Sequence, residues 1–104
     1  MPDPVFRVDI RAADTEVKVE LVGELDVSTA PELRRHVDQI VAGDGDVLVD
    51  CSRLTFADSS GLDTLIRLAK TLRDQERRLV LSNVRQIVRR AIEVLQITDL
   101  VELD

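Results

Sequence analysis

Two adjacent serines in the middle of the chain, Ser59 and Ser60, carry the chemistry that stands out in this sequence. They lie between a short apolar run and a strongly periodic one, so we expect them where a strand gives way to a helix. A serine at such a start accepts a backbone N–H and stabilises the helix by about 1 kcal/mol. An added phosphate is also favoured there, because the free N–H groups and the helix dipole attract negative charge. Either Ser59 or Ser60 can therefore cap the helix while its neighbour accepts a phosphate.

The residues on either side of the serines fit such a site. Gly61 falls in the first helical turn, where glycine costs up to about 1 kcal/mol relative to alanine. We therefore expect a close approach by another group that leaves no room for a side chain. Asp58 places a negative charge beside any phosphate on Ser60.

Metal binding and hydrolytic catalysis find little support. The chain has one histidine and one cysteine, His36 and Cys51, and the spacings of common metal sites are missing. We expect His36 to be solvated on the polar side of a helix, not a general base for Ser60. A nucleophile elbow and a phosphate-binding loop are also missing, so we expect no catalytic residues, no cofactor and no metal.

Composition limits the class of partner. The 104 residues carry a formal net charge of −6, 44% of them are hydrophobic, and only two are phenylalanine. Nucleic-acid binding relies on clustered cations and often on aromatic stacking, so we expect no direct nucleic-acid partner. The core must consist of Val, Leu and Ile, and a protein partner with basic patches fits the charge.

The sequence also predicts a location. Cys51 has no partner for a disulfide, the residues before Val5 do not resemble a signal peptide, and no apolar run is long enough for a membrane span. We expect a soluble cytoplasmic protein without a membrane partner.

The elements that must position the serines follow from periodicity. Alternation predicts half-buried strands over 5–10 and 17–21, joined by a hairpin. A helix follows, with Thr29 and Glu32 as a capping box and Ser28 as the rival cap. Its apolar stripe consists of Leu33, Val37, Ile40 and Val41, and Gly43 to Gly45 end it.

The second half of the chain alternates strands and helices. The apolar run over 46–51 predicts a central strand covered by helices on both faces. A helix after Ser60 and a buried strand over 79–81 follow. The last helix begins with Asn83 and Gln86 as caps, and the tail over 97–103 stays unassigned. The apolar stripe of this helix is expected to consist of Val84, Ile87, Val88, Ala91 and Leu95.

The expected fold is α/β and forms a single domain over 1–104. A mixed sheet of about four strands packs with about three helices in the order β-β-α-β-α-β-α. Each apolar stripe is accounted for by one core, so we expect no leftover patch that demands a dimer. We favour a solvated face over a binding patch for the C-terminal arginines, which are Arg77, Arg78, Arg85, Arg89 and Arg90.

Three segments resemble a known family. The run from Gly23 to Asp26, the strand that ends at Asp50 and the run from Leu54 to Leu62 are similar to the STAS domain of bacterial anti-sigma factor antagonists. The resemblance implies phosphorylation of the second motif serine, Ser60, by the cognate anti-sigma factor, an ATP-using serine kinase. Ser60 is then the expected exposed acceptor, and Ser59 is the better candidate for the helix cap. It further implies that the unphosphorylated form binds that anti-sigma factor and frees sigma. The phosphorylated form lets go, and a PP2C-type phosphatase restores it.

The predicted partner-binding residues surround this motif: Asp26, Asp58, Ser59, Ser60, Gly61 and Asp63. The family position of Asp26 lies at the anti-sigma interface, although turn or capping chemistry explains an aspartate there equally well. Asp63 departs from the small residue that is common in the family and adds a charge one turn from Ser60.

Two other functions remain open. One is a STAS scaffold or transporter-associated module that binds a partner constitutively, with Ser60 only capping. The other is a domain that binds a small ligand or nucleotide, or an enzyme with Ser60 as nucleophile, which lacks a convincing base.

Overall fold

The computed structural model describes residues 6–104, so the predicted strand start at Val5 lies outside the described residues. The described chain forms a five-stranded sheet in the order β1-β2-β3-β4-β5. Strands β1 and β2 are antiparallel, and every later pair is parallel. The elements are β1 Phe6–Ala12, β2 Glu16–Leu25, α1 Ala30–Ala42, β3 Asp46–Ala57, α2 Ser59–Asp74, β4 Leu79–Ser82, α3 Gln86–Val94 and β5 Glu102–Leu103.

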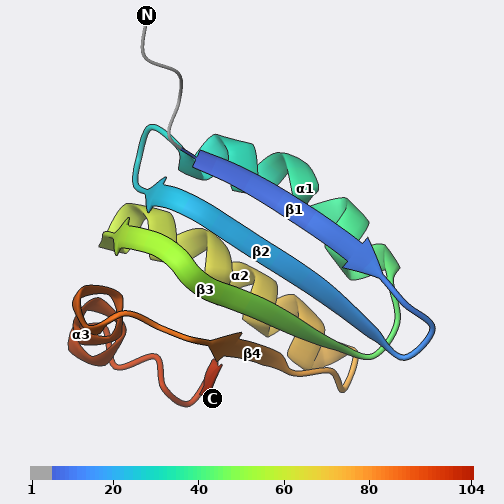
Figure 1. The fold of residues 1–104 in the computed structure, drawn as a ribbon. Helices are drawn as coiled ribbons and strands as arrows, with labels where there is room; N and C mark the ends of the chain where they lie inside the picture. The colour runs from blue at the N-terminus through green and yellow to red at the C-terminus, as the bar shows by residue number, and fades with distance from the viewer. Residues whose placement is uncertain (1–5) are drawn as a thin grey trace, which may run out of the picture.

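The sheet has one covered face and one open face. Helices α1 and α2 lie on the same side of it (Figure 1), as expected when right-handed crossovers join strands that add in one direction. Along β3, Val47 and Val49 are buried while Leu48 between them is partly exposed. The prediction that this strand is covered on both faces is therefore wrong, and its apolar character reflects one buried face.

A single hydrophobic core fills the space between the sheet and the helices. It includes Leu25 at the end of β2, Leu33 and Ile40 of α1, and Leu62 and Leu68 of α2, all nearly inaccessible. Cys51 is buried there too, and burial raises the pKa of its thiol to about 12. The cysteine is thus a core residue and not a reactive one.

The predicted element order is confirmed, with one strand added. The tail contains β5, which pairs Glu102 with Val80 and Leu103 with Leu81. Two residues are too short for alternation to reveal a strand, so only the sheet edge left by β4 identifies it. No helix within 6–104 is long and apolar enough to cross a membrane.

The predicted helix caps are mostly wrong. Thr29 does occupy the N-cap position of α1, but its hydroxyl donates to the carbonyl of Glu24, accepts the N–H of Asp26 and caps no N–H of the helix. Asn83 has a positive φ of 57° and donates to Asp50, so α3 starts from Arg85 instead. In both places a polar side chain found a partner on another element in place of its own helix.

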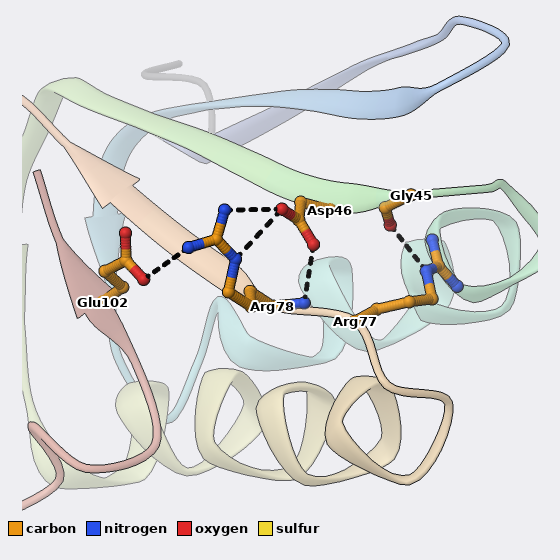
Figure 2. Close-up of polar contacts among 5 residues, drawn as sticks. All are labelled: Gly45, Asp46, Arg77, Arg78 and Glu102. Carbon is orange, nitrogen blue, oxygen red and sulfur yellow. Dashed lines mark hydrogen bonds and ion pairs between the residues drawn. The ribbon is translucent and has the colours of Figure 1, made fainter.

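At the end of the sheet where β3 and β4 begin, charged side chains form hydrogen bonds and ion pairs that join neighbouring elements (Figure 2). Arg78 lies between Asp46 and Glu102, with nitrogen to oxygen distances of 2.9 and 3.1 Å. Half-buried Arg77 donates to the carbonyls of Gly45 and Val41 at 2.6 and 2.9 Å. The predicted solvated face is therefore wrong for Arg77. We call the following five residues the amino-end cluster: Gly45, Asp46, Arg77, Arg78 and Glu102.

Candidate functional site

The opposite end of the sheet brings the predicted site residues together. Leu25 and Ala57 are paired in the parallel register of β2 and β3, and the backbone N–H of Asp58 donates to the carbonyl of Leu25 at 3.1 Å. Asp26 and Asp58 therefore leave neighbouring strands at the same edge. This places the loop before α1 beside the start of α2.

Asp58 is the N-cap of α2. Its backbone is extended and its carboxylate accepts the N–H of Gly61 at 2.8 Å, while its carbonyl accepts the N–H of Leu62 at 2.8 Å. The prediction that Ser59 caps the helix is wrong, because the preceding aspartate already holds the free N–H. Ser59 is instead the first helical residue.

Ser59 and Ser60 are both exposed in the first turn of α2. Within residues 6–104 neither hydroxyl forms a hydrogen bond, and the nearest capping bond goes to Gly61. A free serine hydroxyl beside the positive end of a helix is suited to carry a phosphate. The geometry thus offers two acceptors where the sequence indicated one.

Gly61 is buried against β2. A Cβ there would collide with the carbonyl oxygen of Leu25 and lie 2.7 Å from its Cγ. The close approach that the sequence indicated therefore comes from the chain itself. Gly61 lets α2 pack directly on the end of β2 and so supports the two serines from beneath.

Asp26 organises the loop before α1. One oxygen, Oδ1, accepts the N–H and the hydroxyl of Ser28 at 2.9 and 2.8 Å, and the N–H of Thr29 at 3.1 Å. The hydrogen bond from the Ser28 hydroxyl is the largest cause that lowers the pKa of Asp26, with the two backbone N–H groups adding to it. Within the described chain Oδ2 accepts no hydrogen bond. Turn chemistry thus uses one oxygen and leaves the other available.

Asp63 lies on the exposed side of the first turns of α2. Its carboxylate forms an ion pair with Arg67 at 2.8 Å, one turn further along the helix. Asp63 was expected at the site, but its ion pair with Arg67 was not. The ion pair could have been predicted from the sequence, because opposite charges four residues apart on a helix lie next to each other.

A hollow beside Ser59 was not foreseen. We call it the α3 hollow, and its volume is about 300 Å³. It is lined by Phe56, Ala57, Ser59, Ile87, Arg90, Ala91, Val94 and Leu95. Phe56, Ile87 and Val94 are 37, 53 and 75% exposed. The expectation that one core accounts for every apolar stripe is therefore wrong. Ile87 was assigned to the core stripe of α3, whereas the buried positions are Val88 and Ile92.

The remaining titratable candidate lies on α1 and makes a local contact. The ring of His36 is half-buried, with Nδ1 2.8 Å from the carbonyl oxygen of Glu32. The ring is therefore not freely solvated, contrary to the prediction. In the part of the chain described, no hydrogen bond joins it to either serine. Residues 6–104 also contain no group of acidic, histidine or cysteine side chains able to hold a metal ion.

Comparison with known proteins agrees with this architecture. The family model described as Mlab, STAS domain, matches residues 8–102. The anti-sigma-B factor antagonist of Listeria monocytogenes is 28% identical over 98 residues, which span 92% of this chain and 86% of the relative. An anti-sigma factor antagonist from Mycobacterium paratuberculosis superposes with a TM-score of 0.82 at 23% identity, covering 94% of this chain and 84% of that one.

A third neighbour was solved in a modified state. The Bacillus cell fate determinant SpoIIAA in its phosphorylated form superposes with a TM-score of 0.70 at 20% identity, covering 95% of this chain and 90% of that one. At these identities the two solved structures establish the fold. The family model covers nearly all of the described residues, and the chain belongs to the STAS domain family.

Proposed function

We propose that this chain is an anti-sigma factor antagonist whose binding to a kinase-type anti-sigma factor is switched off by phosphorylation in the Ser59–Ser60 pair. The observation that carries the proposal is the pair of exposed hydroxyls, free of internal hydrogen bonds, at the start of α2. The name of the Listeria monocytogenes relative supports it, as does the phosphorylated state of a protein with the same fold.

The acceptor is placed in the pair and not on Ser60 alone. Ser60 is the acceptor that the family resemblance implies, but the added argument that Ser59 is occupied as the helix cap no longer holds, because Asp58 takes that role. Ser59 also lines the α3 hollow, so a partner seated there passes next to its hydroxyl. Single variants of the two serines decide between them.

A phosphate acts here through charge. It adds about −1.5 to −2 charges at pH 7, in a chain whose net charge is already −6. Asp26 and Asp58 flank the start of α2, so an interface that covers it must desolvate the new charge beside carboxylates. Each 1.4 kcal/mol of penalty weakens binding about tenfold, and a few kcal/mol therefore suffice for a switch.

The α3 hollow supplies apolar area next to the charged part of the site. Burial of a valine or isoleucine side chain contributes about 1.5–3 kcal/mol, and Ile87 and Val94 are free to be buried. In the unphosphorylated state we propose that the anti-sigma factor covers both parts. A PP2C-type phosphatase would return the chain to that state, and sigma would be freed while the anti-sigma factor is held.

Phosphorylation is tested with purified components. The full chain is incubated with each cognate candidate anti-sigma factor and ATP, and phosphate is located by mass spectrometry. We expect phosphate within the Ser59–Ser60 pair and its loss in the double variant Ser59→Ala/Ser60→Ala. Thr98→Ala, which removes an exposed hydroxyl far along the chain, is the matched control and should leave labelling unchanged.

The result of the labelling experiment distinguishes a phosphorylation switch from a constitutive scaffold. Labelling that survives the double variant, or none with any cognate kinase, contradicts the switch. A stable complex without any phosphate transfer indicates a constitutive scaffold instead.

A further inference from the structure

The open face of the sheet contains a hollow that the proposed function does not use. Its volume is about 550 Å³, and its lining includes Arg7, Val22, Gly23, Arg53, Thr55 and Arg85. We call it the open-face hollow. Arg7, Val22 and Arg53 are cross-strand neighbours in the register of β1, β2 and β3, so the two arginines flank a central valine.

The positive charge of this hollow is unusual for the chain. Three arginines from three separate segments line it, and no carboxylate of residues 6–104 does, although acidic residues outnumber basic ones by 20 to 14. Asp9 lies beside the hollow and pairs with Arg7 at 3.0 Å. Its register partner Glu20 and the register partner of Glu20, Asp50, lie further along the same face of the sheet, so the positive charge is confined to the hollow itself.

The arginines are held in a way that leaves donors available. The Nε of Arg85 donates to the carbonyl of Ser52 at 3.0 Å, and the Nε of Arg7 donates to Asp9. Within residues 6–104 the Nη atoms of both remain without a hydrogen bond, and Arg53 forms neither an ion pair nor a side-chain hydrogen bond. Fixing a guanidinium through Nε reduces the entropy that is lost when its other nitrogens bind a ligand.

The floor between the arginines is small and partly apolar. Val22 and Gly23 lie in β2 where its pairing with β3 is irregular, and Gly23 has a φ of 108°. Thr55 donates its hydroxyl to the carbonyl of Gly23 at 3.1 Å and so ties the two strands together at this place. A ligand would thus meet charge at the sides and an uncharged surface beneath.

We propose that the open-face hollow binds a small phosphomonoester. Guanidinium groups match the geometry of phosphate oxygens through paired N–H donors, and the volume lies within the usual range of about 300–1,000 Å³ for small-molecule sites. A monoester supplies a dianion for the arginines and an organic part for Val22. None of the lining residues belongs to the α3 hollow or to the first turn of α2, so this site is separate from that of the serines.

Phenyl phosphate is the probe, titrated into the full chain at constant ionic strength and followed by amide and arginine Nε shifts in NMR spectra. We expect saturable shifts at Gly23, Arg53 and Thr55. Arg53→Gln should weaken binding about tenfold, which corresponds to 1.4 kcal/mol. Arg53→Lys keeps the charge but loses the fork and should give an intermediate value.

Arg34→Gln, on the exposed face of α1, is the matched control and should leave the affinity unchanged. Equal loss in Arg34→Gln and Arg53→Gln would show general charge attraction and overturn the site. So would shifts that fail to saturate. Binding of a glutamate-rich peptide at these residues without binding of phenyl phosphate would replace the proposal with an acidic protein partner. Circular dichroism of each variant confirms that it is folded before its titration is interpreted.

Discussion

The two ends of the sheet hold their polar side chains in different ways. In the amino-end cluster, Arg77 and Arg78 bond to groups 24 to 36 residues away in sequence (Figure 2). At the carboxyl end, Asp26 and Asp58 make side-chain bonds to groups two or three residues away. Long-range bonds join elements to one another, whereas local bonds shape a loop and leave its other atoms free.

This difference assigns stability to one end and binding to the other. Arg77 and Arg78 connect β3, β4, β5 and the end of α1, so their loss loosens the fold. The serines connect nothing in the described chain, and their loss should change only what the surface binds.

The largest effect is expected from Gly61→Ala at the carboxyl end, which is the exception to the division. The added methyl group collides with the backbone of Leu25, so α2 must move off β2 and the free energy of unfolding should fall by about 3 kcal/mol. Urea unfolding measures it. Ser59→Ala and Ser60→Ala are neighbouring controls that should stay within about 0.5 kcal/mol of the parent. A Gly61→Ala variant as stable as the parent contradicts the packing role.

Arg77→Met should lower the free energy of unfolding by about 2 kcal/mol. The change removes charged hydrogen bonds to the carbonyls of Gly45 and Val41, each worth about 1.5–3 kcal/mol. Within the described chain the Nη2 of Arg77 is buried without a partner. Its burial offsets part of the stability that the two hydrogen bonds contribute. Arg77→Lys should recover little, because an ammonium cannot span both carbonyls. Unchanged stability of Arg77→Met would remove the amino-end cluster from the account.

Val94→Glu should weaken partner binding about tenfold, or 1.4 kcal/mol, with a stability change within about 0.5 kcal/mol. Val94 is 75% exposed in the α3 hollow, and a charge there must be desolvated in the complex. Calorimetry with the anti-sigma factor is the measurement. Gln39→Glu adds the same charge on the exposed face of α1 and should bind like the parent. Equal affinities for both variants argue against the hollow as part of the interface.

Asp46→Asn tests the amino end through pH. Hydrogen bonds from the Arg78 side chain are the largest cause that lowers the pKa of Asp46 below its ordinary value of 3.8. A lowered folded-state pKa stabilises the protein above the unfolded value, and that stability is lost as pH falls through the folded-state pKa. The parent should exceed the variant by less than about 1 kcal/mol at pH 7, since the pair is partly exposed. The difference should shrink as the pH falls below 3.8 and vanish below the lowered folded-state pKa. Asp44→Asn, at an exposed position, should show no such convergence, and a pH-independent gap for Asp46→Asn would contradict the assignment.

Asp63→Ala should have the smallest effect. It should raise the affinity of the phosphorylated form for its partner more than that of the free form, by about 0.5 kcal/mol, because a like charge one turn from the phosphate is removed. The ion pair with Arg67 screens Asp63 and limits the gain. Calorimetry of both forms measures it, and equal changes in the two would dispose of the idea.

Most of the fold could be predicted because it depends on periodicity. Alternation and helical stripes revealed the strands and helices that form the core, including Val17, Val19 and Leu65. They failed where an element is short or where two faces of a helix are both apolar. The two residues of β5 illustrate the first case, and Ile87, assigned to the core but exposed on α3, illustrates the second.

The candidate site was located from sequence, but its internal roles were not. Aspartate and serine are about equally good N-caps, so the run from Asp58 to Ser60 cannot show which residue precedes the helix. The pairing of Ala57 with Leu25 decides it, because it ends β3 and makes Asp58 the cap. Arg77 and Arg78 are adjacent in the sequence but have different partners. Only the tertiary structure shows which partner each of them binds.

The central claim is tested most directly by calorimetric titration of the cognate anti-sigma factor with the chain phosphorylated in the Ser59–Ser60 pair and with the unphosphorylated chain. The account predicts at least a tenfold loss of affinity on phosphorylation, equivalent to 1.4 kcal/mol or more. Dephosphorylation should restore the original affinity. Equal affinities of the two forms would contradict the switch, even if the kinase labels these serines.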